Sequence, residues 1–408
     1  MTNNKIAIAG GGLVGSVAAL ALSKIDGIDV HVIDKASKNE LLNINNDGRT
    51  TAVNYASSIL FKNLGVWDEL RLKAEPIWKI QVMEGSDKPH TPWQVTYDSR
   101  EDDHPMGYIV ENDSLRKIVL ENAFSSENIK WHEKNCVVEN ISKNCERIIK
   151  LSNESEITTN LFIGCEGKNS PTRRNLSMKE VSFSYGQKAF VFHVLHEKAH
   201  ENRAFEIFLP KGPLAFLPMK SEEHPENMSG IVWSCDIDRF NELKKLSNEE
   251  LEKEVVKFFP YYGSLKISSK IWEYPLTGIY VPSTIDDRCV IIGDAAHGIH
   301  PIAGQGVNLG WRDAALLYDT VKDHYELGLD IGATSTLMKY EKNCKIGRNK
   351  VSIATNAIFK LFNNDYKSLK FIRNMGLAIT EKLPFAKNEL KKQAMGLISP
   401  LPSLYNKM

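Results

Sequence analysis

The start of the chain shows two apolar runs of strand length, with a glycine-rich turn and a helix-like run between them. Residues 5–9 (KIAIA) are typical of a strand that is buried on both faces of a parallel sheet. A glycine-rich turn occupies residues 10–15, and the Ala- and Leu-rich residues 16–24 predict a helix. Residues 29–33 (DVHVI) predict the second strand. The pattern therefore indicates a strand–turn–helix–strand unit at the start of a parallel sheet.

Later segments alternate between strand-like and helix-like patterns. Residues 161–164 and 288–293 are further apolar runs of strand length, and polar residues with glycine follow each of them. Residues 351–401 have a helical pattern with many lysines. For this last segment we expect helices packed on the body, with a basic amphipathic surface for an anionic membrane as the alternative.

The middle of the chain shows the two-residue alternation of a half-buried strand. Together with the apolar segments that follow, this alternation predicts a mainly antiparallel sheet with one side facing a core. The residues that carry the pattern are Phe205, Ile207, Leu209, Phe216 and Trp233.

The composition is that of an ordinary soluble globular protein, with 42% hydrophobic and 25% charged residues in a length of 408. This length exceeds what one hydrophobic core usually serves, so we expect two domains and a tail. Lys plus Arg and Asp plus Glu each number 51, and a net charge of zero provides no field that would draw the chain to nucleic acid.

Cysteine usage and the apolar runs bear on the compartment. The six cysteines form no C-x-x-C pair, which predicts reduced thiols and a cytoplasmic protein. The strand pattern that begins at Lys5 leaves no room for a signal peptide. Apolar runs are interrupted well before the ~20 residues that cross a bilayer. We therefore expect any membrane contact to be peripheral, at the inner face of the membrane.

The glycine-rich turn has the G-x-G-x-x-G spacing of a dinucleotide site. Gly10 would make the turn, Gly12 would let the backbone approach a pyrophosphate, and Gly15 would allow close helix–strand packing. Asp34 ends the second strand, where a carboxylate accepts hydrogen bonds from a ribose 2′-hydroxyl. A glycine turn without a ligand is the alternative, but strand, helix and acid all stand in the required order. The predicted contacts also include Leu13, Val14 and Lys35.

A second motif follows the apolar run at residues 161–164. Residues 165–173 (CEGKNSPTR) resemble the Asp-Gly motif of flavin monooxygenases with the para-hydroxybenzoate hydroxylase fold. The resemblance implies that Glu166 and Gly167 help to hold FAD and border the passage of a nicotinamide donor. This chain has Glu166 where the family usually has Asp, and the extra methylene leaves the finer hydrogen bonding at this position open.

A third motif, residues 294–309, resembles the flavin-ribityl motif of the same enzymes and decides for FAD over NAD. The resemblance implies that Asp294 accepts a ribityl hydroxyl and that Pro301 fixes the turn against the flavin. A helix that opens at residues 304–308 would place its positive N-terminus at the ring, which stabilises an anionic reduced flavin. The predicted contacts are Asp294, Pro301, Gly304, Gln305, Gly306, Val307 and Asn308.

Two further segments, residues 47–53 (DGRTTAV) and 111–116 (ENDSLR), resemble the ubiquinone-biosynthesis FAD-dependent hydroxylases, and the similarity runs over nearly the whole chain. Arg49 could neutralise the pyrophosphate through a bidentate fork. By resemblance, Glu111 or Arg116 contacts FAD. For residues 111–116, an N-capped surface helix with solvated charges is the alternative.

The resemblance implies an FAD-dependent monooxygenase that hydroxylates the aromatic ring of a polyprenylated phenol in ubiquinone biosynthesis. NAD(P)H or a reductase protein would reduce the flavin, O2 would add to it, and the flavin hydroperoxide would deliver one oxygen atom to the ring. The cofactor carries this chemistry, so no catalytic side chain is assigned. The pocket candidates are Phe216, His297, His300 and Pro301.

Three alternatives to this interpretation bear on function. A flavin-dependent reductase of a prenyl substrate and a non-catalytic FAD-bound subunit of a ubiquinone-biosynthesis complex both stay open. Metal binding by the pairs His193-x-x-His196 and His297-x-x-His300 is not expected, because a strand or a Gly/Pro turn does not place such pairs as ligands.

The three motifs lie in separate stretches, so we expect a discontinuous Rossmann-like FAD-binding domain with an inserted, mainly antiparallel substrate domain. The predicted FAD-binding domain comprises residues 1–75, 106–178 and 279–344. The predicted substrate domain comprises residues 76–105 and 179–278, and residues 345–408 form a C-terminal helical segment. This arrangement is the α/β, para-hydroxybenzoate hydroxylase-like fold class.

Overall fold

The computed structural model describes residues 4–43, 47–85, 94–300, 304–362, 381 and 383–407. Its first sheet is mostly parallel and begins with the predicted strand–turn–helix–strand unit, β1 (Asn4–Ala9), α1 (Leu13–Leu22) and β2 (Ile28–Ile33). The helix begins at Leu13, within the glycine motif and earlier than the predicted residues 16–24. The strand order is β19 (Ile285–Asp286), β20 (Cys289–Ile291), β12 (Leu161–Gly164), β1, β2 and β8 (Ile129–His132).

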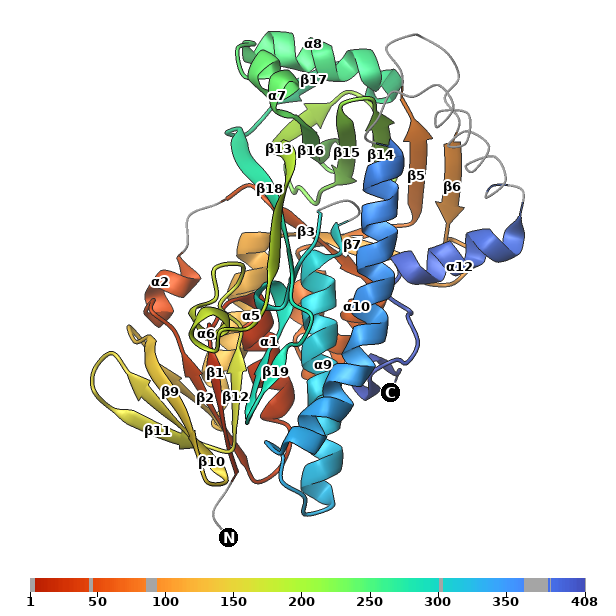
Figure 1. Ribbon diagram of the computed structural model, residues 1–408. Coiled ribbons are helices and arrows are strands. Elements are labelled where there is room, and N and C mark those ends of the chain that lie inside the picture. Colours follow the sequence, from red (N-terminus) through yellow and green to blue (C-terminus); the bar gives the residue numbers. More distant parts are fainter. Residues whose placement is uncertain are drawn as a thin grey trace.

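Helices cover this sheet and form the largest core with it (Figure 1). Helix α1 contacts both α5 (Asn112–Ser125) and α9 (Gly306–Glu326). Ile6, Ile8 and Val30 of the sheet are fully buried beneath them. Each such side chain contributes ~1.5–3 kcal/mol through burial, which fixes the carboxyl ends of the strands relative to the helices.

The second large sheet is mainly antiparallel, as the alternation predicted. Phe205, Ile207 and Leu209 point to its core side, where α7 (Ile237–Leu243) and α8 (Asn248–Phe258) cover them (Figure 1). The strand order is β21 (His297–Gly298), β18 (Trp272–Tyr280), β13 (Val181–His196), β16 (Met228–Asp236), β15 (Gly212–Pro218), β14 (Arg203–Leu209), β5 (Lys79–Glu84) and β6 (Gln94–Asp98), with β17 (Leu265–Ile267) paired to β13.

Smaller elements complete the described chain. One three-stranded sheet contains β11 (Glu156–Thr159), β10 (Glu146–Leu151) and β9 (Val137–Lys143), and another contains β3 (Thr50–Asn54), β7 (Gly107–Glu111) and β4 (Ala74–Ile77). The short helices are α2 (Lys38–Leu42), α3 (Tyr55–Leu64), α4 (Trp67–Arg71), α6 (Pro171–Asn175), η1 (Pro260–Tyr262), η2 (Gly293–Ala295) and η4 (Ser403–Tyr405).

The C-terminal part is helical where it is described. Helix α10 (Thr334–Phe362) runs beside α9, and α12 (Pro384–Ala394) lies beside β6 (Figure 1). The predicted domain boundary at residues 344 and 345 lies inside α10, and the division into domains stays a prediction. Residues 363–380, which carry part of the predicted helical pattern, lie outside the described residues. No helix in the described ranges is long and apolar enough to cross a membrane.

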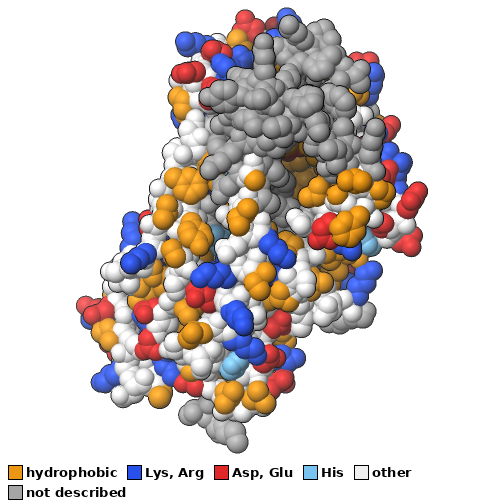
Figure 2. All heavy atoms as spheres, turned by 45° about the vertical axis from the view of Figure 1, so that its right-hand side comes forward, with side chains coloured by type: hydrophobic (Ala, Val, Ile, Leu, Met, Phe, Trp, Pro, Cys, Tyr) orange, Lys and Arg blue, Asp and Glu red, His pale blue; other side chains and the backbone are white. Residues whose placement is uncertain are grey.

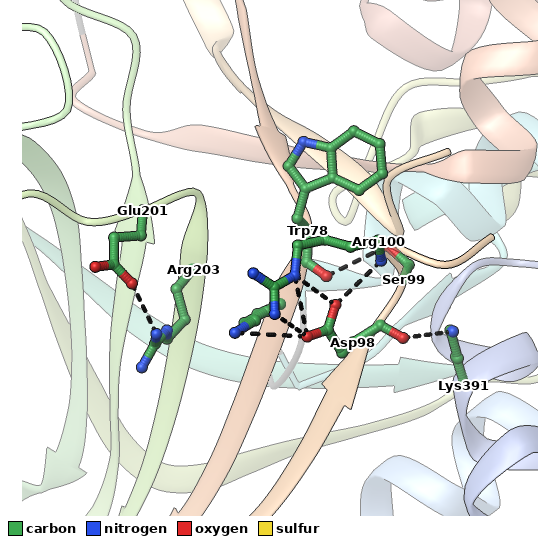
Figure 3. A network of polar contacts seen from close by, with 8 residues as sticks. Trp78, Asp98, Ser99, Arg100, Glu201, Arg203 and Lys391 are labelled. Carbon is green, nitrogen blue, oxygen red and sulfur yellow. Dashed lines mark hydrogen bonds and ion pairs between the residues drawn. The ribbon is translucent and has the colours of Figure 1, made fainter. Parts of the chain in front are cut away.

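A polar network attaches α12 to the second sheet (Figure 3). Lys391 Nζ donates to the carbonyl oxygen of Asp98 at 2.6 Å, and the same ammonium group pairs with Asp102. The carboxylate of Asp98 is itself bound by Arg100, whose Nη2 lies 2.8 Å from Oδ2. These contacts hold α12 against β6, so that one face of the helix can close a cavity.

Candidate functional site

A cavity of about 1420 Å³ is lined by residues of both large sheets and of α12. Ligand pockets commonly measure ~300–1,000 Å³, so this one has room for a large cofactor and a second molecule. Its first part lies at the carboxyl ends of β1 and β2, where open α/β sheets bind their ligands. Figure 2 turns the α12 side forward, and hydrophobic side chains gather there among charged ones.

The glycine turn shapes one end of the cavity. A Cβ at Gly15 would lie 1.9 Å from the carbonyl oxygen of Gly10, so only glycine lets α1 pack so closely on β1. A Cβ at Gly12 would meet no protein atom within 4 Å, because this position borders the cavity. Gly12 is the N-cap of α1 and provides no side-chain cap, so the first backbone N–H groups are available to an anion.

Asp34 lines the same end of the cavity, together with Leu13, Val14 and Lys35. Its carboxylate is held by two backbone donors, from Gly11 N at 2.7 Å and from Ala36 N at 2.8 Å. A carboxylate can accept about four hydrogen bonds, so Asp34 keeps capacity for a ribose hydroxyl.

Arg49 and Arg116 both line the cavity, whereas Glu111 does not. Asp47 holds the two guanidinium groups, with Nη2 of Arg49 at 2.5 Å and Nη2 of Arg116 at 3.8 Å from its Oδ2. Tyr274 stacks with Arg49 at 5.2 Å from the ring centroid. The two guanidinium groups place cationic N–H donors here that could pair with a pyrophosphate. This part of the cavity, with the α1 N-terminus, Arg49 and Arg116, is called the positive arm.

Glu166 and Gly167 line the cavity beside the glycine turn. The longer side chain of Glu166 folds back on its own loop, where Oε2 accepts from Ser170 Oγ at 2.6 Å and from Thr172 N at 3.1 Å. The described partners of this carboxylate therefore belong to the protein. A contact between Glu166 and FAD stays a prediction.

Arg173 connects the second motif to the third, a role that the sequence did not reveal. Its guanidinium is buried, and it donates from Nη1 to the carbonyl oxygen of Ala295 at 2.9 Å and from Nη2 to that of Lys168 at 2.6 Å. Glu180 pairs with the same group. The arginine thereby fixes the loop that follows β12 against η2.

The third motif brings Asp294 and the start of α9 to the cavity. Gln305 is the N-cap of α9 and provides no side-chain cap, so a second set of helix N–H groups opens onto the site. Asn308 lies outside the lining and joins α9 to β3, donating to the carbonyl oxygen of Ala52 at 2.7 Å. Pro301 lies outside the described residues. The lining includes Asp294, Gly304, Gln305, Gly306 and Val307.

The other three pocket candidates do not line the described cavity. Phe216 points to the opposite side of β15 and packs on Phe259 with ring centroids 4.2 Å apart. His300 is buried against Gln187, with 3.0 Å between Nε2 and Oε1. Burial, assisted by Lys168, lowers the pKa of His300 to about 4. His297 is also buried, and it pairs with a carboxylate on α9.

That carboxylate, Asp313, is at the centre of a buried charge cluster that the sequence did not reveal. Its Oδ2 lies 2.6 Å from His297 Nε2 and accepts from Gly293 N at 3.2 Å, while its Oδ1 lies 3.1 Å from Arg348 Nε. Burial opposes the charge, but Arg348 and His297 outweigh it, so the pKa of Asp313 lies well below its usual value. The cluster holds the β20–η2 turn, and with it Asp294, against α9 and α10.

The remainder of the cavity is mostly apolar and belongs to the second sheet. A single acidic side chain, Glu206 of β14, stands on this face within the described lining. Phe205, Ile207 and Leu209, which carry the alternation in the sequence, lie on the opposite face of β14. The apolar lining includes Ile77, Ile80, Val82, Val95, Val191, Ala204, Phe208, Ala215, Leu217, Val232, Leu276 and Leu390.

The other histidine pair considered in the sequence has protein partners. His193 Nε2 lies 3.0 Å from the carbonyl oxygen of Gly48, and His196 Nε2 lies 2.9 Å from Ser229 Oγ. The described residues contain no group of three or more His, Cys, Asp or Glu that could hold a metal ion.

Comparison with known proteins gives one family and one fold. Residues 3–345 match the family described as FAD binding domain. The chain is 33% identical over 400 residues to ubiquinone hydroxylase UbiL of Rhodospirillum rubrum, covering 96% of this chain and 90% of that protein. It is 28% identical over 405 residues to 3-demethoxyubiquinol 3-hydroxylase of Escherichia coli, covering 97% and 100%.

Among solved structures, p-nitrophenol 4-monooxygenase PnpA of Pseudomonas putida DLL-E4 aligns with a TM-score of 0.77 at 15% identity, covering 96% of this chain and 98% of that chain. This likeness confirms the predicted fold class. The positive arm of the cavity fits FAD on two structural grounds: two uncapped helix N-termini open onto it, and the surface at Gly12 is free of side chains.

Replacing Gly12 with alanine is expected to weaken FAD binding by about tenfold or more while the fold persists. The added methyl group meets no protein atom but occupies space at the α1 N-terminus, where the pyrophosphate is predicted to lie. The measurement is the Kd of FAD for the apoprotein, followed by quenching of flavin fluorescence. Gly15→Ala is the contrasting variant, because its Cβ has no room and it should lose stability as well. An unchanged Kd in Gly12→Ala would contradict the predicted position of the pyrophosphate.

Replacing Asp313 with asparagine is expected to lower the free energy of unfolding by ~3–5 kcal/mol at pH 7, because Arg348 is left buried without its counter-ion. Denaturant unfolding measures this effect, and Asp323→Asn on the exposed side of α9 is the control, with a loss below ~1 kcal/mol. The pKa of Asp313 is lower in the folded protein than its ordinary value of 3.8. The stability that the ionised carboxylate contributes is therefore fully present above pH 3.8 and is lost as the pH falls further. Equal losses in the two variants would show that the cluster contributes no more than a surface pair.

Proposed function

Because this chain belongs to the FAD binding domain family together with the ubiquinone hydroxylases, we propose that it is an FAD-dependent monooxygenase that hydroxylates the aromatic ring of a polyprenylated phenol in ubiquinone biosynthesis. The observation that carries the proposal is one continuous cavity that is lined by the glycine motif and two arginines at one end and by mostly apolar side chains of the second sheet in the remainder, which is called the apolar chamber. An enzyme that binds only a dinucleotide and a small polar substrate would need the arm alone. A substrate ring with a hydrocarbon tail also needs the apolar chamber.

FAD is the cofactor, and the residues along the positive arm would hold it. The α1 N-terminus and Arg49 would bind the pyrophosphate, and Asp34 would accept from the adenosine ribose. Asp294 would accept from the ribityl chain, with the α9 N-terminus at the flavin. When bound, FAD supplies the redox chemistry that activates O2 for transfer of one oxygen atom.

The apolar chamber would receive the aromatic ring and the first part of its tail. Valine, isoleucine and leucine side chains from four or more strands bury such a group at ~25 cal/mol per Å² of apolar surface. They also exclude water from the reacting atoms, which protects a reactive oxygen species from decay. These side chains therefore bind and orient the ring, while the cofactor transfers the oxygen.

The tail of the substrate would leave the cavity beside α12 and enter the membrane there. Leu390 and Ala394 of α12 line the cavity, and Phe385 on the same helix is 85% exposed. An exposed phenylalanine next to lysines is suited to a peripheral contact with an anionic membrane surface. The same proposal includes membership of a ubiquinone-biosynthesis complex. It also includes reduction of the flavin by NAD(P)H or by a reductase protein.

The central experiment supplies the chain to cells that lack ubiquinone hydroxylation and measures lipid extracts by mass spectrometry. We expect a prenylphenol precursor to gain one oxygen atom, and we expect Asp294→Ala to abolish the gain because a ribityl contact is lost. Asp323→Asn is the matched control and should support full conversion. FAD-loaded protein that leaves the precursor unchanged would instead favour a flavin-dependent reductase or a non-catalytic subunit; donor-dependent bleaching of the flavin separates these two.

The membrane contact has its own measurement, flotation with vesicles that contain anionic lipid. Phe385→Ser is expected to reduce the partition coefficient onto the vesicles about tenfold or more, because one buried phenylalanine contributes ~1.5–3 kcal/mol. Leu327→Ser, at the far end of α9 and 73% exposed in the parent protein, is the control and should bind like the parent. Equal binding by all three proteins would remove α12 from the membrane contact.

A further inference from the structure

The cavity side of the second sheet contains a continuous row of six side chains, one from each neighbouring strand. Strand pairing places Val95 opposite Val82, Val82 beside Glu206, Glu206 opposite Ala215, Ala215 opposite Val232, and Val232 opposite Val191. All six line the cavity. The other five are apolar, so Glu206 places one carboxyl group within a row whose remaining side chains are hydrocarbon.

No described residue accounts for this carboxyl group. In the part of the chain that the structure describes, it has neither a hydrogen-bond donor nor a cation as a partner. Glu84, the acidic residue at the end of the neighbouring strand β5, differs from Glu206 because it does interact with another group. Buried polar groups are nearly always hydrogen-bonded, and leaving one unpaired destabilises a protein.

The burial of Glu206 disfavours its charged form. Burial raises its pKa to about 7, and no charge among the described residues contributes to the shift. Glu206 is only partly covered by protein, because it borders the cavity. A perturbed acid that faces an open cavity and has no protein partner is typical of a group that meets a ligand.

We propose that the Glu206 carboxylate accepts a hydrogen bond from the ring hydroxyl of the substrate, and so selects phenols over ring ethers and orients the ring in the chamber. This inference rests on the proposed function and assigns one residue to its substrate. A phenol offers one O–H donor in a largely apolar molecule, and the row of side chains offers one acceptor among apolar neighbours.

The contact also favours the reaction. A hydrogen bond to a carboxylate increases the negative charge on the phenolic oxygen, and this charge is delocalised onto the ortho and para carbons of the ring. Those carbons then react more readily with an electrophilic oxygen. A hydrogen bond with one charged partner is about twice as strong as a neutral one, and a dry cavity strengthens it further.

Few other groups on this face titrate near neutral pH. Strand β15 carries no ionisable side chain, and the charged residues of β5 are at its ends, Lys79 and Glu84. Tyr97 and Tyr274 line the same chamber, and burial raises the pKa of both phenols, for Tyr97 to about 12. From α12 the lining residues are Leu390 and Ala394. A change of rate between pH 6 and 8 that depends on position 206 therefore reports Glu206.

The test uses the FAD-loaded protein with a short-chain 2-prenylphenol and its O-methyl ether, and measures kcat/KM for hydroxylation. We expect the parent to prefer the phenol, and Glu206→Gln to lose about 10- to 100-fold with the phenol but little with the ether. Glu273→Gln, on the exposed side of the same sheet, is the control and should match the parent. A Glu206→Gln variant that keeps the parent's preference for the phenol overturns the inference.

The pH profile provides a second, independent readout. Because the ionised carboxylate is the acceptor, kcat/KM of the parent should rise about tenfold from pH 6 to pH 8. Glu206→Gln should lose this rise. A parent rate that falls over the same interval would mean that Glu206 donates a proton to the substrate, and it would overturn the proposed role as acceptor.

Folding and flavin content separate the possible failures. Glu206→Gln should bind FAD as the parent does and should melt at an equal or higher temperature at pH 8, because a neutral amide replaces a desolvated charge. A lower melting temperature would assign Glu206 a structural role and contradict the inference. If the parent hydroxylates neither compound, the proposed function fails; if it hydroxylates the phenol and Glu206→Gln does so equally, only the inference fails.

Discussion

The close approach of α1 to β1 is the constraint on which the site depends. It exists because Gly15 presents no side chain to the carbonyl oxygen of Gly10, where a Cβ would lie only 1.9 Å away. As a result, the first turn of α1 begins at the carboxyl edge of the sheet with its N–H groups uncapped. A helix that began farther from the sheet would leave the positive end of its dipole outside the cavity.

The same edge is completed by segments that are distant along the chain. Arg173 joins the loop after β12 to η2. Asp313 of α9 accepts a hydrogen bond from the backbone of η2 and pairs with Arg348 on α10. These contacts bring a second uncapped helix to the cavity. The second sheet then adds an apolar surface to a positive one, so one space offers both phosphate and hydrocarbon a favourable environment. Flavin-dependent hydroxylation of a lipid-like phenol requires both parts.

The first strand–turn–helix unit could be predicted from glycine spacing and buried strands, which are local signals. The fold class and the two later motifs followed from the resemblance to a known family. The sequence did not reveal the Asp313 cluster, since its partner Arg348 lies on another helix and no spacing connects them. Phe216 was predicted for the pocket but packs in the core, because alternation shows that a strand has two faces without showing which one meets the cavity. Glu206 was missed for the same reason. Whether the motif residues contact FAD stays a prediction.

The most direct test of the account is hydroxylation by the purified, FAD-loaded protein under isotopically labelled O2, with a donor and a short-chain prenylphenol. The account predicts a product that carries one labelled oxygen atom on the ring, formed only when donor and FAD are both present. A ring product whose new oxygen is unlabelled, or donor oxidation that reduces the prenyl chain and leaves the ring unchanged, would contradict it.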